Sequence, residues 1–144
     1  MAIREVGHED LVRVAELLQQ LWPEKRVDIE DDAMRETMDK YFNGTSYRIY
    51  GYEEETLLGI ITASFRWALF YQGKVAIIED LVVDRSHRGK GIGSRLVDYL
   101  EHRIYADDSV KGIELSSDLD RDEAHQFWEK CGYSKLAFQF RKAV

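Results

Sequence analysis

Residues 88–93 read Arg-Gly-Lys-Gly-Ile-Gly and come a few positions after an apolar run that ends at Val83. Apolar residues then recur every four positions, so the glycines should lie between a strand and a helix N-terminus. Backbone N–H groups at that end of a helix carry partial positive charge, and glycines let an anion approach them closely. The loop therefore suits a pyrophosphate. It differs from a Walker A loop, because Gly91 follows Lys90, and from a dinucleotide-binding loop, because residue 94 is Ser94.

Two adjacent carboxylates, Glu79 and Asp80, interrupt the otherwise apolar stretch 75–83. The stretch is apolar at both alternating sets of positions, which is typical of a central strand covered on both faces. A carboxyl group in such surroundings can have a raised pKa, as a general base near neutral pH requires. Strand alternation predicts that Glu79 lies on the same face as Val83 and that Asp80 points the opposite way.

The chain has 27 acidic and 20 basic residues and a net charge of −7, which argues against a nucleic-acid partner. Residues 85–95 contain four basic side chains and no acid, whereas acids crowd at 28–32, 53–55 and 118–123. A small basic island attracts a compact anion, while the surrounding acids favour a cationic second ligand. The charge pattern thus predicts two different ligands.

The length of 144 residues fits one domain, 1–144, since no linker, repeat or low-complexity tract interrupts it. The single cysteine excludes an intramolecular disulfide, and no Cys/His spacing resembles a zinc site, so we expect no metal. The N-terminus lacks an apolar leader, and no apolar run reaches about 18 residues. These features predict a cytoplasmic protein without a membrane partner.

Hydrophobic periodicity predicts a βαβα run in the second half of the chain, after two helices and a hairpin. A proline after Trp22 ends the first helix, and Gly132 caps the last. Helices are expected near 11–21, 31–42, 92–104 and 124–131, and strands near 3–6, 47–52, 57–70, 75–83, 112–116 and 133–141.

The stretch from Val83 to Gly93 follows the pattern V-x-x-x-x-R-x-x-G-x-G, and Ala-x-x-Phe-aromatic follows at 124–128. In this order the segments resemble the GNAT superfamily of N-acetyltransferases over nearly the whole chain. The resemblance implies an α/β (α+β) fold with a central mixed, mostly antiparallel sheet of six to seven strands. That sheet would splay between its fourth and fifth strands and be flanked by about four helices.

The same resemblance implies acetyl-CoA as co-substrate, with its pyrophosphate on the glycine loop and its pantetheine arm along the fourth strand. Arg121 stands where many members carry a pantetheine-binding asparagine, although the aminoalkylphosphonate type also has arginine there. Phe127 is a further cofactor-binding candidate. By matched position, the other cofactor-binding residues would be Leu81, Val82, Val83, Arg88, Gly89, Lys90, Gly91, Ile92, Gly93 and Ser94.

The implied reaction is attack of a neutral primary amine on the thioester carbonyl. Glu79 is expected to be the general base, directly or through water, with Asp80 as the second catalytic candidate, because the fourth strand of the resembled fold borders the acceptor side. A backbone N–H near Leu81 or Val82 would polarise the thioester oxygen. Trp22, Arg66 and Trp128 are candidate acceptor-binding residues, although the family often has a tyrosine acid at the position of Trp128. The resemblance also makes Tyr41, Phe42 and Trp67 candidates to line the acceptor pocket.

Resemblances to aminoalkylphosphonate, aminoglycoside and polyamine acetyltransferases point to a small-molecule amine, and the acid clusters favour a polycationic one. Two alternatives stay open: a peptide or protein N-acetyltransferase, and an acyl-CoA-binding module without turnover. Dimers are common in the resembled family, so a homodimer is compatible with the sequence, which identifies no interface.

Overall fold

The computed structural model describes residues 2–144, which divide into two compact units, the first ending at Glu114 and the second comprising Leu115–Val144. That the chain forms a single domain stays a prediction. Within residues 2–144, no helix combines the length and apolarity needed to cross a membrane. In chain order the elements are β1 (Ala2–Glu5), α1 (Leu11–Leu21), α2 (Asp32–Phe42), β2 (Tyr47–Glu53), β3 (Leu57–Ala68), β4 (Gly73–Val83), α3 (Ile92–Tyr105), β5 (Val110–Leu115) and α4 (Asp122–Lys130).

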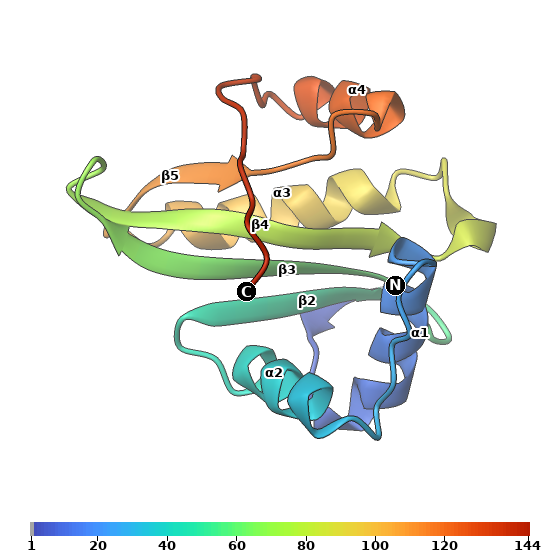
Figure 1. Cartoon of the computed structure of the whole chain (residues 1–144). Helices are drawn as coiled ribbons and strands as arrows, with labels where there is room; N and C mark the ends of the chain where they lie inside the picture. Colours follow the sequence, from blue (N-terminus) through green and yellow to red (C-terminus); the bar gives the residue numbers. More distant parts are fainter. Residues whose placement is uncertain (1) are drawn as a thin grey trace. The chain divides into compact units, whose positions relative to one another are not determined.

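The five strands form one sheet in the order β1-β2-β3-β4-β5, and the first four run antiparallel to their neighbours (Figure 1). β5 follows the α3 crossover and points the same way as β4, as the arrows in Figure 1 show. The Lys74 N–H, at the start of β4, donates to the Ser109 carbonyl oxygen at 2.8 Å. From there the two ribbons move apart toward their arrowheads in Figure 1. The predicted mixed, mostly antiparallel sheet with four α-helices is confirmed.

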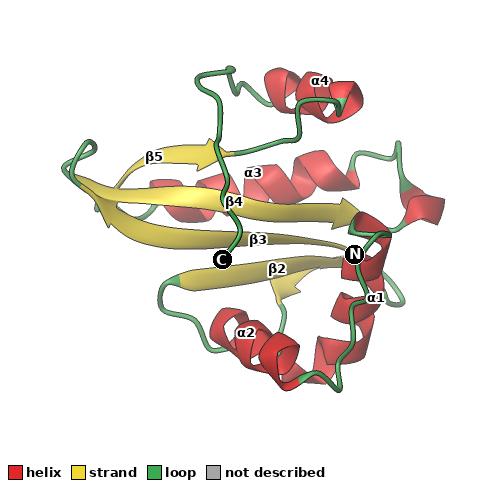
Figure 2. Ribbon diagram, in the orientation of Figure 1, coloured by secondary structure: helices red, strands yellow, loops and turns green. Residues whose placement is uncertain are grey.

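The predicted count of six to seven strands is wrong, because the part of the chain that the structure describes forms five. Residues 133–141, expected to supply closing strands, contain none, and Figure 2 draws this segment as loop. Its alternate residues Leu136, Phe138 and Phe140 are 85%, 75% and 92% exposed. The alternation is that of a strand, but a strand exists only where neighbouring backbone groups complete its hydrogen bonds.

α1 and α2 cover one face of the sheet, and α3 covers the other. Ile60 on β3 and Val82 on β4 belong to the same buried cluster as Leu17 of α1 and Met38 of α2. Gly59, one residue before Ile60, faces the opposite way: a Cβ there would lie 3.2 Å from Leu96 and 3.3 Å from Ile92 of α3. The small residue therefore lets α3 approach the strand closely.

The pairing of β3 with β4 contains one irregularity. Thr62 lies opposite Asp80, but the next residue, Ala63, lies opposite Ile78. Glu79 is therefore an extra residue on β4, a β-bulge that breaks the strict alternation of side chains.

Candidate active site

The bulge brings both carboxylates of the Glu79-Asp80 pair to the face that α1 and α2 cover. Asp80 Oδ2 accepts a 2.6 Å hydrogen bond from Thr62 Oγ1, and Glu79 Oε1 accepts a 2.6 Å bond from Ser64 Oγ. Thr62 and Ser64 are two residues apart on a strand whose pairing with β2 is regular there, so they share a face. The prediction that Glu79 and Asp80 point to opposite faces is wrong, because the extra residue cancels the alternation between them.

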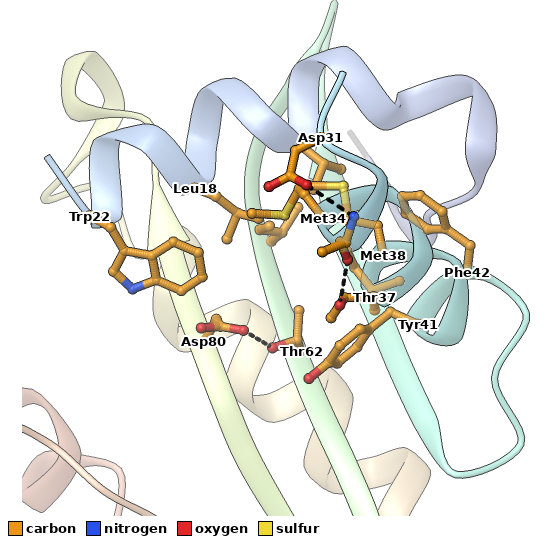
Figure 3. Close-up of a pocket in the computed structure, with 14 residues that line it drawn as sticks. Leu18, Trp22, Asp31, Met34, Thr37, Met38, Tyr41, Phe42, Thr62 and Asp80 are labelled. Atoms are coloured by element: carbon orange, nitrogen blue, oxygen red, sulfur yellow. Dashed lines mark hydrogen bonds between the residues drawn. The ribbon is translucent and has the colours of Figure 1, made fainter. Parts of the chain in front are cut away.

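Asp80 lines a cavity of about 360 Å³ between α1, α2 and the middle of the sheet (Figure 3). Figure 3 shows Asp80 and Trp22 on one side of it and Tyr41 with Met38 on the other. The lining residues are Val14, Leu18, Trp22, Asp31, Ala33, Met34, Thr37, Met38, Tyr41, Phe42, Ile49, Ile60, Thr62 and Asp80.

The ends of the two helices set the shape of this cavity. α1 ends at Leu21. The N–H of its C-cap residue Trp22 donates to the Leu18 carbonyl at 2.9 Å, and Pro23 prevents the helix from continuing. α2 begins after Asp31, whose side chain accepts a 3.0 Å bond from the Ala33 N–H. The end of α1 and the start of α2 therefore both border the space in front of Asp80.

Burial raises the pKa of Asp80 above its usual value of 3.8, and the negative charge of Glu79 adds to this effect. The hydrogen bond from Thr62 acts in the opposite direction and lowers it. Burial and the same two carboxylates raise the pKa of Tyr41 to about 12. The cavity thus holds a carboxyl group whose pKa is shifted toward the range of a general base, near a tyrosine that keeps its proton.

The glycine loop starts from the end of β4 and is tied to both β4 and α1. Arg88 Nε donates to the Val83 carbonyl at 3.0 Å. Gln20 of α1 donates through Nε2 to Asp84 Oδ1 at 2.8 Å and accepts from the Arg85 N–H at 2.9 Å. The helix that borders the cavity therefore also holds the segment that leads into the loop.

Gly89 and Gly91 adopt φ values of +79° and +83°, which disfavour any residue with a Cβ. Apart from each glycine and its two chain neighbours, no residue has a heavy atom within 4 Å of the point where a Cβ would stand on Gly89 or Gly91. α3 begins directly after Gly91, so the first N–H groups of the helix lack intrahelical acceptors. Arg88 and Lys90 are exposed beside them. An anion can approach this helix end without displacing protein atoms.

The backbone N–H groups of Leu81 and Val82, both predicted as possible donors to the thioester oxygen, point to opposite edges of β4. Asp84 N–H donates to the Leu58 carbonyl of β3 at 2.7 Å. Because N–H directions alternate along a strand, the N–H of Val82 also faces β3, whereas that of Leu81 faces the opposite edge of β4. The side chain of Val82 is 3% exposed and lies in the core. Of the two N–H groups, only that of Leu81 is directed away from β3, and its role as donor to the thioester oxygen stays a prediction.

The other predicted site residues belong to both units. Trp22 lines the cavity, whereas Arg66 of β3 is exposed and lies outside it. Arg121, which precedes α4, and Phe127 and Trp128 within α4 belong to the second unit, where the two rings meet edge to face at 5.0 Å. The roles of Arg66, Arg121, Phe127 and Trp128 stay predictions.

Sequence reasoning placed Tyr41 and Phe42 at the acceptor pocket, and both line the cavity. It missed Met34 and Met38, which share a helix face with Tyr41, because the high charge of the segment obscured this stripe. Sequence reasoning also missed Thr62 and Ser64, the partners of the two carboxylates, because no local signal marks the bulge. Among the described residues, no group of His, Cys, Asp and Glu side chains could hold a metal ion.

Comparison with known proteins places this geometry in a family. The model of the Acetyltransferase (GNAT) family matches residues 12–133. The aminoalkylphosphonate N-acetyltransferase of Salmonella typhimurium is 31% identical over 88 residues, which are 61% of this chain and 56% of that protein. The chain spans about half the length of the curated relatives it matches.

Solved structures share the whole fold. The crystal structure of glucosamine-6-phosphate N-acetyltransferase from Arabidopsis thaliana is 26% identical and covers 99% of this chain and 97% of its own, with a TM-score of 0.81. A structure described as a transcriptional regulator from Bacillus halodurans reaches a TM-score of 0.89 at 22% identity, over 99% of both chains, and shows the fold alone. With the family model matching most of its length, the chain belongs to the Acetyltransferase (GNAT) family.

Proposed function

We propose that this protein is an acetyl-CoA-dependent N-acetyltransferase that acts on the primary amine of a small molecule bound in the cavity beside Asp80. One observation carries the proposal: Asp80, whose pKa is raised, lines a largely apolar cavity. Asp80 belongs to β4, the strand that leads into the glycine loop. The relatives named above act, by their names, on an aminoalkylphosphonate and on glucosamine 6-phosphate, both small amines. Their names support a small acceptor here.

The glycine loop fits the pyrophosphate of acetyl-CoA. The open space over Gly89 and Gly91 admits phosphate oxygens, the free N–H groups at the start of α3 can donate to them, and Arg88 and Lys90 add positive charge. When bound, acetyl-CoA supplies the thioester carbonyl that the amine attacks. The N–H of Leu81, which faces the edge of β4 away from β3, is the donor for its oxygen.

Asp80 is the general base in this proposal, and Glu79 assists it. An amine with a pKa of about 10.4 enters as the ammonium ion and must lose a proton before its nitrogen can attack. Asp80 faces the cavity and can take that proton, while Glu79, bonded to Ser64 alongside, adds negative charge that attracts the cation. The amine nitrogen then bonds to the carbonyl carbon and the C–S bond breaks. The nitrogen loses its second proton as it becomes an amide, and the departing thiolate takes up a proton to leave as the thiol. This assignment departs from the sequence-based choice of Glu79.

The test measures thiol release from acetyl-CoA with a panel of primary amines, together with acetyl-CoA binding by calorimetry. Asp80→Asn should lower kcat by about 10²–10⁴-fold, the usual worth of a general base, with unchanged acetyl-CoA affinity. Glu79→Gln should reduce the rate less. Arg88→Glu should weaken acetyl-CoA binding, whereas Arg26→Glu, a charge reversal at a 90% exposed side chain outside residues 85–95, should not.

Acetyl-CoA binding without turnover of any amine, short peptides included, would replace the proposal by a non-catalytic acyl-CoA-binding module. Turnover of peptides alone would indicate a peptide or protein N-acetyltransferase. The cytoplasmic location, the lack of a nucleic-acid partner and a homodimer stay predictions.

A further inference from the structure

The cavity beside Asp80 has a composition that selects among amines. Of its fourteen lining residues, all within the described chain, two are aspartates, two are threonines and ten are apolar or aromatic; none is Lys, Arg or His. A phosphate or phosphonate group in this space would meet no cation and would lie in the field of Asp80 and Glu79. The side chains therefore disfavour an anionic acceptor.

Few hydrogen-bond donors in the cavity remain for an anion or for a sugar. Thr62 Oγ1 donates to Asp80 at 2.6 Å, and Thr37 Oγ1 donates to the Ala33 carbonyl at 2.7 Å, so both threonine protons are committed within the protein. The Trp22 indole N–H and the Tyr41 hydroxyl are the neutral donors that remain among the lining side chains. A polyhydroxylated amine would leave several groups without partners, at a cost in affinity.

The negative charge of the cavity is concentrated at one place. Asp80 lies within the cavity with Glu79 beside it, whereas Asp31 is exposed at the N-terminus of α2, where the Ala33 N–H and the helix dipole offset its charge. Of the three acid-rich segments in the sequence, only 28–32 contributes a lining residue. A single strongly anionic position favours an acceptor with one ammonium group. The acid clusters of the sequence instead predicted a polycationic acceptor.

We propose that the acceptor is an amphipathic primary amine with one positive charge and an apolar or aromatic body, and that amines bearing a phosphate or phosphonate are excluded. Its ammonium group lies at Asp80, and its body lies among Met34, Met38, Tyr41 and Trp22. Methionine side chains adapt to varied apolar shapes, and aromatic rings attract an adjacent cation. This inference rests on the proposed function and specifies its acceptor.

The test compares kcat/KM for phenylethylamine, hexylamine, spermidine, glucosamine 6-phosphate and 2-aminoethylphosphonate at saturating acetyl-CoA. We expect the two apolar amines to exceed both phosphorus-bearing amines by about 100-fold or more, since a phosphate or phosphonate in the cavity would lose its hydration without a cation to pair with. Met34→Arg, which places a cation in the cavity, should lower kcat/KM for phenylethylamine at least tenfold. Met34→Leu, of similar volume, should keep it within about threefold.

The outcomes separate this inference from the proposed function. Preference for a phosphorus-bearing amine or for spermidine would overturn the inference and leave the acetyltransferase proposal standing. If the unaltered protein shows no acetyl-CoA binding in calorimetry, the proposed function itself is wrong. If Met34→Arg leaves phenylethylamine turnover unchanged while Asp80→Asn abolishes it, the acceptor body lies elsewhere and the inference is wrong.

Discussion

Thr62 Oγ1 donates a 2.6 Å hydrogen bond to Asp80 Oδ2 across the β3–β4 pair, at the residue that follows the bulge. The bond favours the ionised carboxylate, whereas burial favours the neutral acid and has the larger effect. The pKa of Asp80 is therefore set by two opposing effects, burial and the Thr62 hydrogen bond, and a single substitution can remove the second.

Replacing Thr62 with valine should move the acid limb of the kcat/KM–pH profile to higher pH. The hydrogen bond lowers the pKa of Asp80, so its loss lets burial raise that pKa further, and the base is then ionised only at higher pH. The valine side chain has a similar shape, which keeps the cavity filled. Ser64→Ala is the control, since Ser64 binds Glu79 and not Asp80. A limb that moves in Ser64→Ala and not in Thr62→Val would transfer the role of base to Glu79.

Asp80→Asn should stabilise the protein at neutral pH while it removes activity. The pKa of Asp80 is raised in the folded state, so the folded protein binds its proton more tightly than the unfolded chain. The destabilising effect of the ionised Asp80 carboxylate is therefore absent below the unfolded pKa of about 3.8 and grows as pH rises through the folded pKa. Thermal melts should show a larger gain in Tm at pH 7 than at a pH below 3.8. An equal or lower Tm at pH 7 would contradict the effect of burial.

Gly91→Ala should destabilise the protein by about 1–2 kcal/mol, the cost of a left-handed conformation for a residue with a Cβ. The space around Gly91 is open, so this cost arises from the backbone and not from a clash. Acetyl-CoA affinity should fall with it. Gly91→Asn is the matched variant, because asparagine tolerates this conformation better. Chemical denaturation and calorimetry check both, and equal losses in the two variants would count against a backbone cause.

Arg4 should make stability depend on pH below about 4. Its guanidinium binds both oxygens of Asp10 at 2.9 Å and both oxygens of Glu53 at 3.0 Å. These bonds hold the pKa of Asp10 below 3.8 and that of Glu53 below 4.5, so their stabilisation is present above those values and is lost as pH falls through the lower folded values.

Arg4→Met should therefore cost about 1.5–3 kcal/mol at neutral pH through the partly buried pair with Asp10, and should flatten the acid decline of stability. Arg26→Met is the control, because Arg26 is 90% exposed and lies 3.6 Å from Asp28. Denaturation midpoints between pH 3 and pH 7 measure both variants. A decline as steep in Arg4→Met as in the parent would assign the acid sensitivity to other carboxylates.

Much of the fold follows from local patterns. The apolar spacing of α1 and α3, the proline after Trp22 and the glycines before Ile92 all act within a few residues, and the structure places these elements where the patterns predict them. The C-terminal alternation at Leu136, Phe138 and Phe140 failed as a predictor, because strand formation depends on a hydrogen-bonding neighbour that no local pattern specifies.

The sequence by itself determined that a glycine-rich turn precedes a helix and that two carboxylates sit in an apolar strand, since both are statements about neighbours in the chain. Only the tertiary structure decided that the two carboxylates share a face. That outcome depends on one extra residue in the pairing of β4 with β3, and register is a property of two strands. It also decided that Asp80 faces a cavity whose walls come from α1 and α2, segments more than 35 residues earlier in the chain.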